Sequence, residues 1–142
     1  MKIERQIEED GLIITHFGGL HTYNDASEAL NELDEVNKGK KSIYEIVIND
    51  NDIGLSFSRE EEQLLIKKVG TIYTNFSLGA LAVVACNDFI FGMRRLLEMS
   101  IRNELIAIPV FRSEALARMW IDEIRELHSQ RFHEDRSYPS GL

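Results

Sequence analysis

Three short apolar runs, separated by amphipathic stretches, constrain the fold of this chain most strongly. The runs span residues 43–49 (IYEIVIN), 78–86 (LGALAVVAC) and 105–111 (LIAIPVF). Alternation of short apolar runs with helical patterns is typical of strand–helix–strand crossovers, in which helices cover a parallel sheet. The nearly all-apolar run 78–86 predicts a strand inside the sheet, buried on both faces. Pro109 lacks a backbone donor and predicts that the last strand lies at a sheet edge or contains a local irregularity.

An antiparallel hairpin is predicted before the first crossover. Residues 2–8 and 12–18 flank Asp10-Gly11, a dipeptide that suits a tight turn because glycine adopts positive φ at low cost. Gly18-Gly19 predicts a further turn before the first helix. The expected fold class is therefore α/β, with a mixed, mostly parallel sheet, an N-terminal β-hairpin and four helices.

The four predicted helices begin at recognisable caps. Thr22 with Asp25 opens a helix to about residue 38, before Gly39, and Ser58 with Glu61 opens a helix to about residue 75. A third helix spans about 88–102. The fourth begins after Ser113 and is expected to end near His128. Its predicted buried face consists of Leu116, Ala117, Trp120, Ile121, Ile124 and Leu127.

Composition predicts one cytoplasmic domain. The chain has 142 residues, 44% of them hydrophobic, and we expect a domain over 1–128 and a loose tail over 129–142. A net charge of −8 argues against binding to nucleic acid or to an anionic membrane, because such binding depends on basic surface. The single cysteine, the charged N-terminus and the lack of an apolar run of roughly 18 residues predict no disulfide, no signal peptide and no stable membrane insertion.

Nothing in the sequence predicts an enzyme or a cofactor. The chain contains no glycine-rich phosphate loop, no GxSxG and no HExxH. Cys86 closes an apolar strand with no histidine near it in sequence, which favours an inert buried thiol. Four histidines, His16, His21, His128 and His133, show no metal-binding spacing, and we interpret them as scattered surface residues.

The order of elements and one local motif resemble the STAS domain, the SpoIIAA-like (anti-sigma-factor antagonist) family. In its small stand-alone bacterial members a final strand ending in an aromatic residue leads to a capped helix that carries an alanine and then a tryptophan. Here that stretch is 109-PVFRSEALARMWIDEI-124, and the resemblance covers roughly residues 1–127. It implies a binding or regulatory module.

The resemblance also points to two candidate phosphosites. Regulatory members carry a phosphorylated serine or threonine in an Asp-Ser-Ser-Gly-like motif that opens the helix after the middle strand. The corresponding stretch, 52-DIGLSFSREEE-62, offers Ser58 and Ser56 without the adjoining Asp and Gly. Glutamates 60–62 would oppose a phosphate there, so we expect no physiological phosphorylation.

A candidate site follows from the topology. In open parallel sheets ligands bind beyond the carboxyl ends of the strands. Asp50, Ser58, Asp88 and Arg112 lie at those ends. They form either a small polar pocket or partner-binding rim, or simply helix caps and turns.

The predicted helix 88–102 offers a candidate interface. One face is apolar, while Phe91, Arg95 and Arg102 lie together on the opposite side. An aromatic residue among arginines is typical of an interface anchor. The leading hypothesis is therefore a non-enzymatic module that binds a protein partner, including a second copy of itself as a homodimer. The alternative is a small protein that binds a small or apolar ligand, or an enzyme, using the pocket past the strand ends.

Overall fold

The main sheet has five strands in the order β1-β2-β4-β6-β7. The computed structural model describes residues 2–76, 78–85, 88 and 109–137. The strands of this sheet are β1 (Lys2–Ile7), β2 (Ile13–Gly18), β4 (Ser42–Asn49), β6 (Leu78–Ala85) and β7 (Val110–Phe111). β1 and β2 form the predicted antiparallel hairpin, and the other three pairings are parallel. The predicted mixed, mostly parallel α/β sheet is confirmed.

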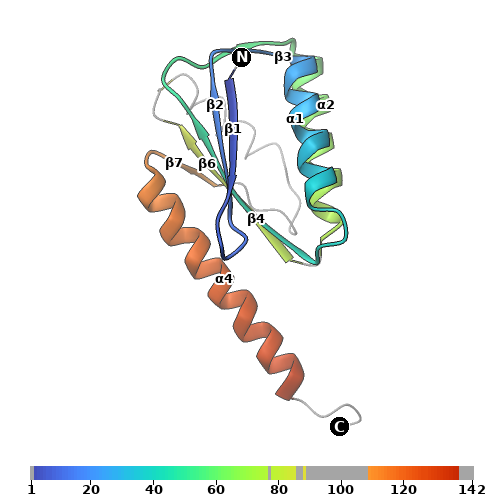
Figure 1. Cartoon of the computed structure of the whole chain (residues 1–142), viewed down its shortest axis with the longest axis vertical. Helices are drawn as coiled ribbons and strands as arrows, with labels where there is room; N and C mark the ends of the chain where they lie inside the picture. The colour runs from blue at the N-terminus through green and yellow to red at the C-terminus, as the bar shows by residue number, and fades with distance from the viewer. Residues whose placement is uncertain (1, 77, 86–87, 89–108, 138–142) are drawn as a thin grey trace.

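Helices cover both faces of this sheet (Figure 1). Helices α1 (Tyr23–Val36) and α2 (Arg59–Thr74) lie together on one face, and α4 (Glu114–Ser137) lies on the other. These three helices are the ones that the described residues contain. The fourth predicted helix, 88–102, lies outside the described residues apart from Asp88. Within the described part of the chain, no helix combines the length and apolar character needed to cross a bilayer.

Both predicted capping boxes are present. The Thr22 hydroxyl accepts a hydrogen bond from the Asp25 backbone N–H, and the Asp25 carboxylate accepts one from the Thr22 N–H. Ser58 and Glu61 make the same reciprocal pair at the start of α2. Each box satisfies two backbone donors that would otherwise lack partners, and so fixes where the helix begins.

The α4 face of the sheet combines large aliphatic side chains with two alanines of β6. Ala80 and Ala82 of β6 belong to one cluster with Ala117 and Ile121 of α4, and all four side chains are buried. The alanines leave little side-chain bulk between α4 and β6, and the layer excludes water at these positions. Trp120 packs at the border of the cluster, 6.0 Å from the Phe111 ring, and is only half-buried.

The opposite face contains a buried polar network within an apolar cluster. The Glu45 carboxylate of β4 accepts hydrogen bonds from the Thr15 hydroxyl at 2.9 Å and the Tyr73 hydroxyl at 3.1 Å. Burial raises the pKa of Glu45, and the Thr15 hydrogen bond, the Arg5 charge and the Tyr73 hydrogen bond oppose that shift. Burial, together with the adjacent Glu45, also raises the pKa of Tyr73 well above its usual value. The network joins β2, β4 and α2.

The predicted end of the last helix was wrong. We expected it near His128, with a loose tail over 129–142, but α4 continues to Ser137. The sequence from Gln130 to Ser137 is polar but contains neither proline nor glycine, and Pro139 is the first residue that must break a helix. A polar sequence without proline or glycine does not by itself end a helix.

Two short strands were not predicted. β3 (Leu20–Thr22) and β5 (Gly54–Ser56) pair in parallel as a separate small sheet, in segments that we interpreted as a turn and a loop. Three residues are too few to show a period of two. The last predicted strand, 105–111, is described only from Pro109. The Pro109 carbonyl accepts a hydrogen bond from the Val83 N–H, and β7 is the last strand in the order of the sheet. This agrees with the predicted edge position.

Replacing Glu45 should change how stability depends on pH. Because its folded-state pKa is raised, the folded protein keeps a proton that the unfolded chain loses above the ordinary value of 4.5. Glu45 therefore lowers stability progressively as pH rises from 4.5 to its folded-state pKa, and does not do so below 4.5. Glu45→Gln removes this ionisation. The unfolding free energy of the variant should therefore increase relative to that of wild type as pH rises through that window.

Urea unfolding at a series of pH values checks this expectation, with Glu28→Gln as a control because Glu28 is exposed on α1. Parallel stability–pH curves for wild type and Glu45→Gln would contradict the assigned pKa direction.

Candidate functional site

Asp50 lies where the carboxyl ends of β2 and β4 meet. Its Oδ1 is 3.7 Å from Nδ1 of His16, and its backbone N–H donates to the Phe17 carbonyl. A Cβ at position 18 would lie 2.9 Å from Asp50 Oδ2 and 3.2 Å from Asp52 Oδ1, so a larger residue there would require these carboxylates to move. Asp52 also accepts from the Gly19 N–H at 3.3 Å. The two aspartates therefore belong to a tight turn at the carboxyl ends of β2 and β4.

Asp88 and Arg112 form an ion pair at the same end of the sheet. Arg112 Nη1 lies 2.7 Å from Asp88 Oδ1, at the ends of β6 and β7. The Asp88 side chain is 92% exposed and that of Arg112 47% exposed, so water screens this pair. The structure thus brings together two of the four residues predicted at the strand ends.

Ser58 is a helix cap. Its hydroxyl accepts a hydrogen bond from the Glu61 N–H at 3.1 Å, and three glutamates occupy the first turn of α2. Ser56 belongs to β5 and pairs with Thr22 in the small sheet. The capping alternative is therefore observed at Ser58, and whether either serine is phosphorylated stays a prediction.

Some predicted features lie outside the described residues. These are Cys86 and the candidate interface on helix 88–102, formed by Phe91, Arg95 and Arg102. The side chain of His133 also lies outside the described part.

The interpretation of the histidines as surface residues was wrong in part. His21 is 2% exposed, with Nε2 3.0 Å from the Gly18 carbonyl and its ring edge-on to Phe17. His128 is half-buried, and its Nδ1 lies 2.6 Å from the Tyr44 hydroxyl. Among the residues that the structure describes, no group of three or more metal-ligating side chains is close enough to hold a metal ion.

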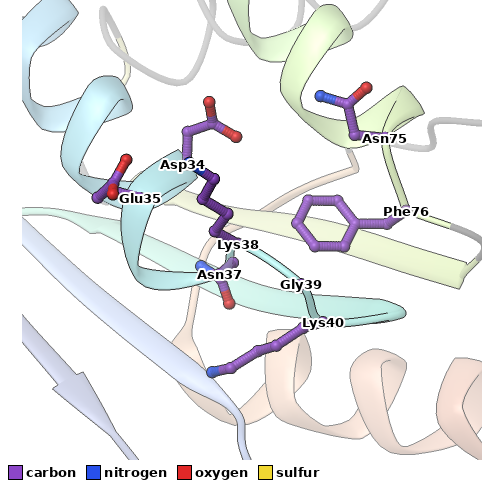
Figure 2. Close-up of a pocket in the computed structure, with 8 residues that line it drawn as sticks. All are labelled: Asp34, Glu35, Asn37, Lys38, Gly39, Lys40, Asn75 and Phe76. Atoms are coloured by element: carbon purple, nitrogen blue, oxygen red, sulfur yellow. The ribbon is translucent and has the colours of Figure 1, made fainter.

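An open depression of about 270 Å³ lies at the opposite end of the sheet, where α1 and α2 end. Figure 2 shows Phe76 pointing toward the turn between α1 and β4. The lining is mostly polar and includes Asp34, Glu35, Asn37, Lys38, Gly39, Lys40, Asn75 and Phe76. Because most of these residues carry charge or an amide, the depression does not resemble the mostly apolar pockets that hold small ligands.

Helix α4 is fastened to the hairpin by two arginines. Arg118 donates to both carboxylate oxygens of Glu8, at 2.6 and 3.4 Å, and Glu8 holds the pKa of Arg118 above its usual range. Arg125 donates to the Asp10 carboxylate at 2.9 Å and lies 5.0 Å above the Tyr44 ring. These contacts hold the helix in one orientation on the sheet, because each arginine is fixed by more than one bond.

The outer surface of α4 carries apolar side chains that remain exposed. Leu116, Met119 and Leu127 are 50%, 60% and 54% exposed. Leu116 and Leu127 were predicted to be buried, and this was wrong because the apolar arc of the helix is wider than its contact with the sheet.

Acidic side chains accompany these apolar residues. Between residues 114 and 130 the exposed charged residues are Glu114, Asp122, Glu123 and Glu126. Glu114 is paired with Arg118 one turn along the helix, at 3.1 Å. We therefore use the name outer α4 surface for the three apolar residues and the three remaining acidic ones, namely Leu116, Met119, Leu127, Asp122, Glu123 and Glu126.

Removing the Arg118 contact should loosen α4. Arg118→Met keeps the aliphatic stem but leaves Glu8, whose side chain is 28% exposed, without its bidentate partner. We expect a loss of about 1–2 kcal/mol in unfolding free energy, below the value for a fully buried pair because both groups are partly solvated. Lys2→Met is the control, since the Lys2–Glu4 pair is at least 65% exposed. Equal urea midpoints for the two variants would contradict this role of Arg118.

The comparison with solved structures identifies the fold. No protein-family model and no curated protein matches the chain. An uncharacterised protein of the DUF3478 family from Shewanella loihica PV-4, described as having a SpoIIAA-like fold, superposes with a TM-score of 0.57. The identity is 17%, over 84% of this chain and 92% of the other. The fold predicted from the STAS resemblance is thus confirmed: this chain has the SpoIIAA-like fold.

Proposed function

We propose that this protein is a cytoplasmic, non-enzymatic module that binds a protein partner through the outer α4 surface. The observation that carries the proposal is the exposure of Leu116, Met119 and Leu127 on one helix. Large apolar side chains gathered on a preformed surface are typical of binding sites, because association removes them from water. The SpoIIAA-like fold is compatible with this role but does not by itself imply it.

The way α4 is held supports binding without large rearrangement. Arg118 and Arg125 fix the helix against the hairpin, and its own residues Ala117 and Ile121 are fully buried against the sheet. A partner therefore meets a helix that is already ordered, and the entropic cost of association is lower than for a segment that must fold.

A photo-crosslinking amino acid at position 119 tests the proposal in cells that naturally express the protein. The matched control position is Leu64 on α2, where the side chain is 52% exposed, close to the 60% of Met119. We expect defined protein adducts from position 119 that are absent from position 64. Combining Leu116→Ser with Leu127→Ser should abolish the adducts at position 119. The same adducts at both positions, or none at position 119, would contradict the proposal.

A further inference from the structure

The charged residues of α4 are sorted between its two sides. Between residues 114 and 130 the helix contains two arginines, Arg118 and Arg125, and both reach the carboxylates of the hairpin turn, at Glu8 and Asp10. The exposed charged residues of the same stretch are all acidic. Arg112, just before the helix, is ion-paired with Asp88. The described outer side of the helix therefore presents carboxylates to solvent.

The apolar and acidic residues form adjacent stripes. At about 100° per residue, Leu116, Trp120 and Leu127 follow one line along the border of the buried face. A second line, farther from the sheet, contains Asp122 and Glu126.

Met119 and Glu123 lie between the two lines, so the stripes touch. The apolar line extends over about three turns of helix, from residue 116 to residue 127. The three carboxylates lie within residues 122–126, beside the second half of that line. The outer α4 surface therefore offers apolar contact along its length and negative charge at one end.

From this arrangement we infer that the outer α4 surface binds a cationic amphipathic helix of a partner protein. The apolar face of such a helix would cover the three apolar residues, while its lysines or arginines would reach Asp122, Glu123 and Glu126. The inference rests on the proposed function and names the chemistry of the partner. Complementary charge gives this pairing specificity and speeds association.

The same charges disfavour two other occupants. A second copy related by a two-fold axis would bring one outer α4 surface against another, and each would offer the other carboxylates rather than the cations that pair with them. An anionic membrane would be repelled for the same reason. A basic partner is the occupant that neutralises the surface.

Trp120 provides a direct optical signal. It is the only tryptophan of the chain, it is half-buried, and it follows the same line along the helix as Leu116 and Leu127. A helix that covers these two leucines would remove water from the indole, so binding should shift its emission to shorter wavelength.

Two synthetic 18-residue peptides without tryptophan test the inference. They share leucines at helical spacing and differ only in carrying lysine or glutamate on the polar face. We expect the lysine peptide to bind the full-length protein at least about tenfold more tightly than the glutamate peptide, and to lose affinity as salt rises. Glu123→Lys with Glu126→Lys should weaken the lysine peptide about tenfold or more.

Controls separate local contacts from overall charge and folding. Glu28→Lys with Glu35→Lys makes the same change in net charge on exposed positions of α1, and should alter affinity by less than about twofold. Met119→Ser should weaken binding, whereas Leu64→Ser should not. Circular dichroism shows whether each variant folds.

Three results would overturn the inference: equal affinity for both peptides, no binding of the lysine peptide, or a dimer that Met119→Ser dissociates. If position 119 still forms specific crosslinks in any of these cases, the protein-binding role stands and only the cationic partner is wrong. Absence of crosslinks would remove the proposed function itself.

Discussion

The packing of α4 on the sheet is the constraint on which the other features of this structure depend. Ala80 and Ala82 of β6 meet Ala117 of α4 with at most 3% exposure, and larger side chains at these positions would hold the helix farther away. In this position Arg118 reaches Glu8, and Arg125 reaches Asp10. The packing therefore sets both the orientation of the helix and the side that it presents to solvent.

The other face of the sheet balances burial against hydrogen bonding. A buried carboxyl group at Glu45 is costly, and the hydroxyls of Thr15 and Tyr73 offset part of that cost. The arrangement also restricts α2, because a rotation that moved the Tyr73 hydroxyl away would leave a buried oxygen unpaired. An apolar residue at position 45 could pack there without such a restriction. The polar network thus links the position of α2 to the register of β2 and β4.

Local features could be predicted from sequence, and features that join distant residues could not. The two capping boxes each depend on residues three positions apart, and the strands on runs of a few residues, so the pattern alone identified them. The Thr15–Glu45 bond joins residues 30 apart, and the Arg118–Glu8 pair joins residues 110 apart. No periodicity reveals such partners. They require the folded sheet.

The candidate site shows the same limit from another side. Helical periodicity correctly placed Ala117 and Ile121 against the sheet, but it could not show how wide the contact would be, and so it placed Leu116 and Leu127 there as well. Topology predicted a site from the residues at the strand ends, but Ser58 caps α2 and the Asp50 carbonyl accepts from the Ile53 N–H in a tight turn. Type and position of a residue indicate what it can do, while the neighbours decide what it does.

The distribution of charge on α4 places carboxylates beside its exposed apolar residues. The two arginines of residues 114–130 are used on the inner side, where they pair with Glu8 and Asp10. What remains outside is an apolar line bordered by negative charge. Apolar contact alone would attract many surfaces, including another copy, but each approach must also satisfy the carboxylates beside it. The ion pairs that hold the helix in place thereby also leave its outer side with uncompensated negative charge.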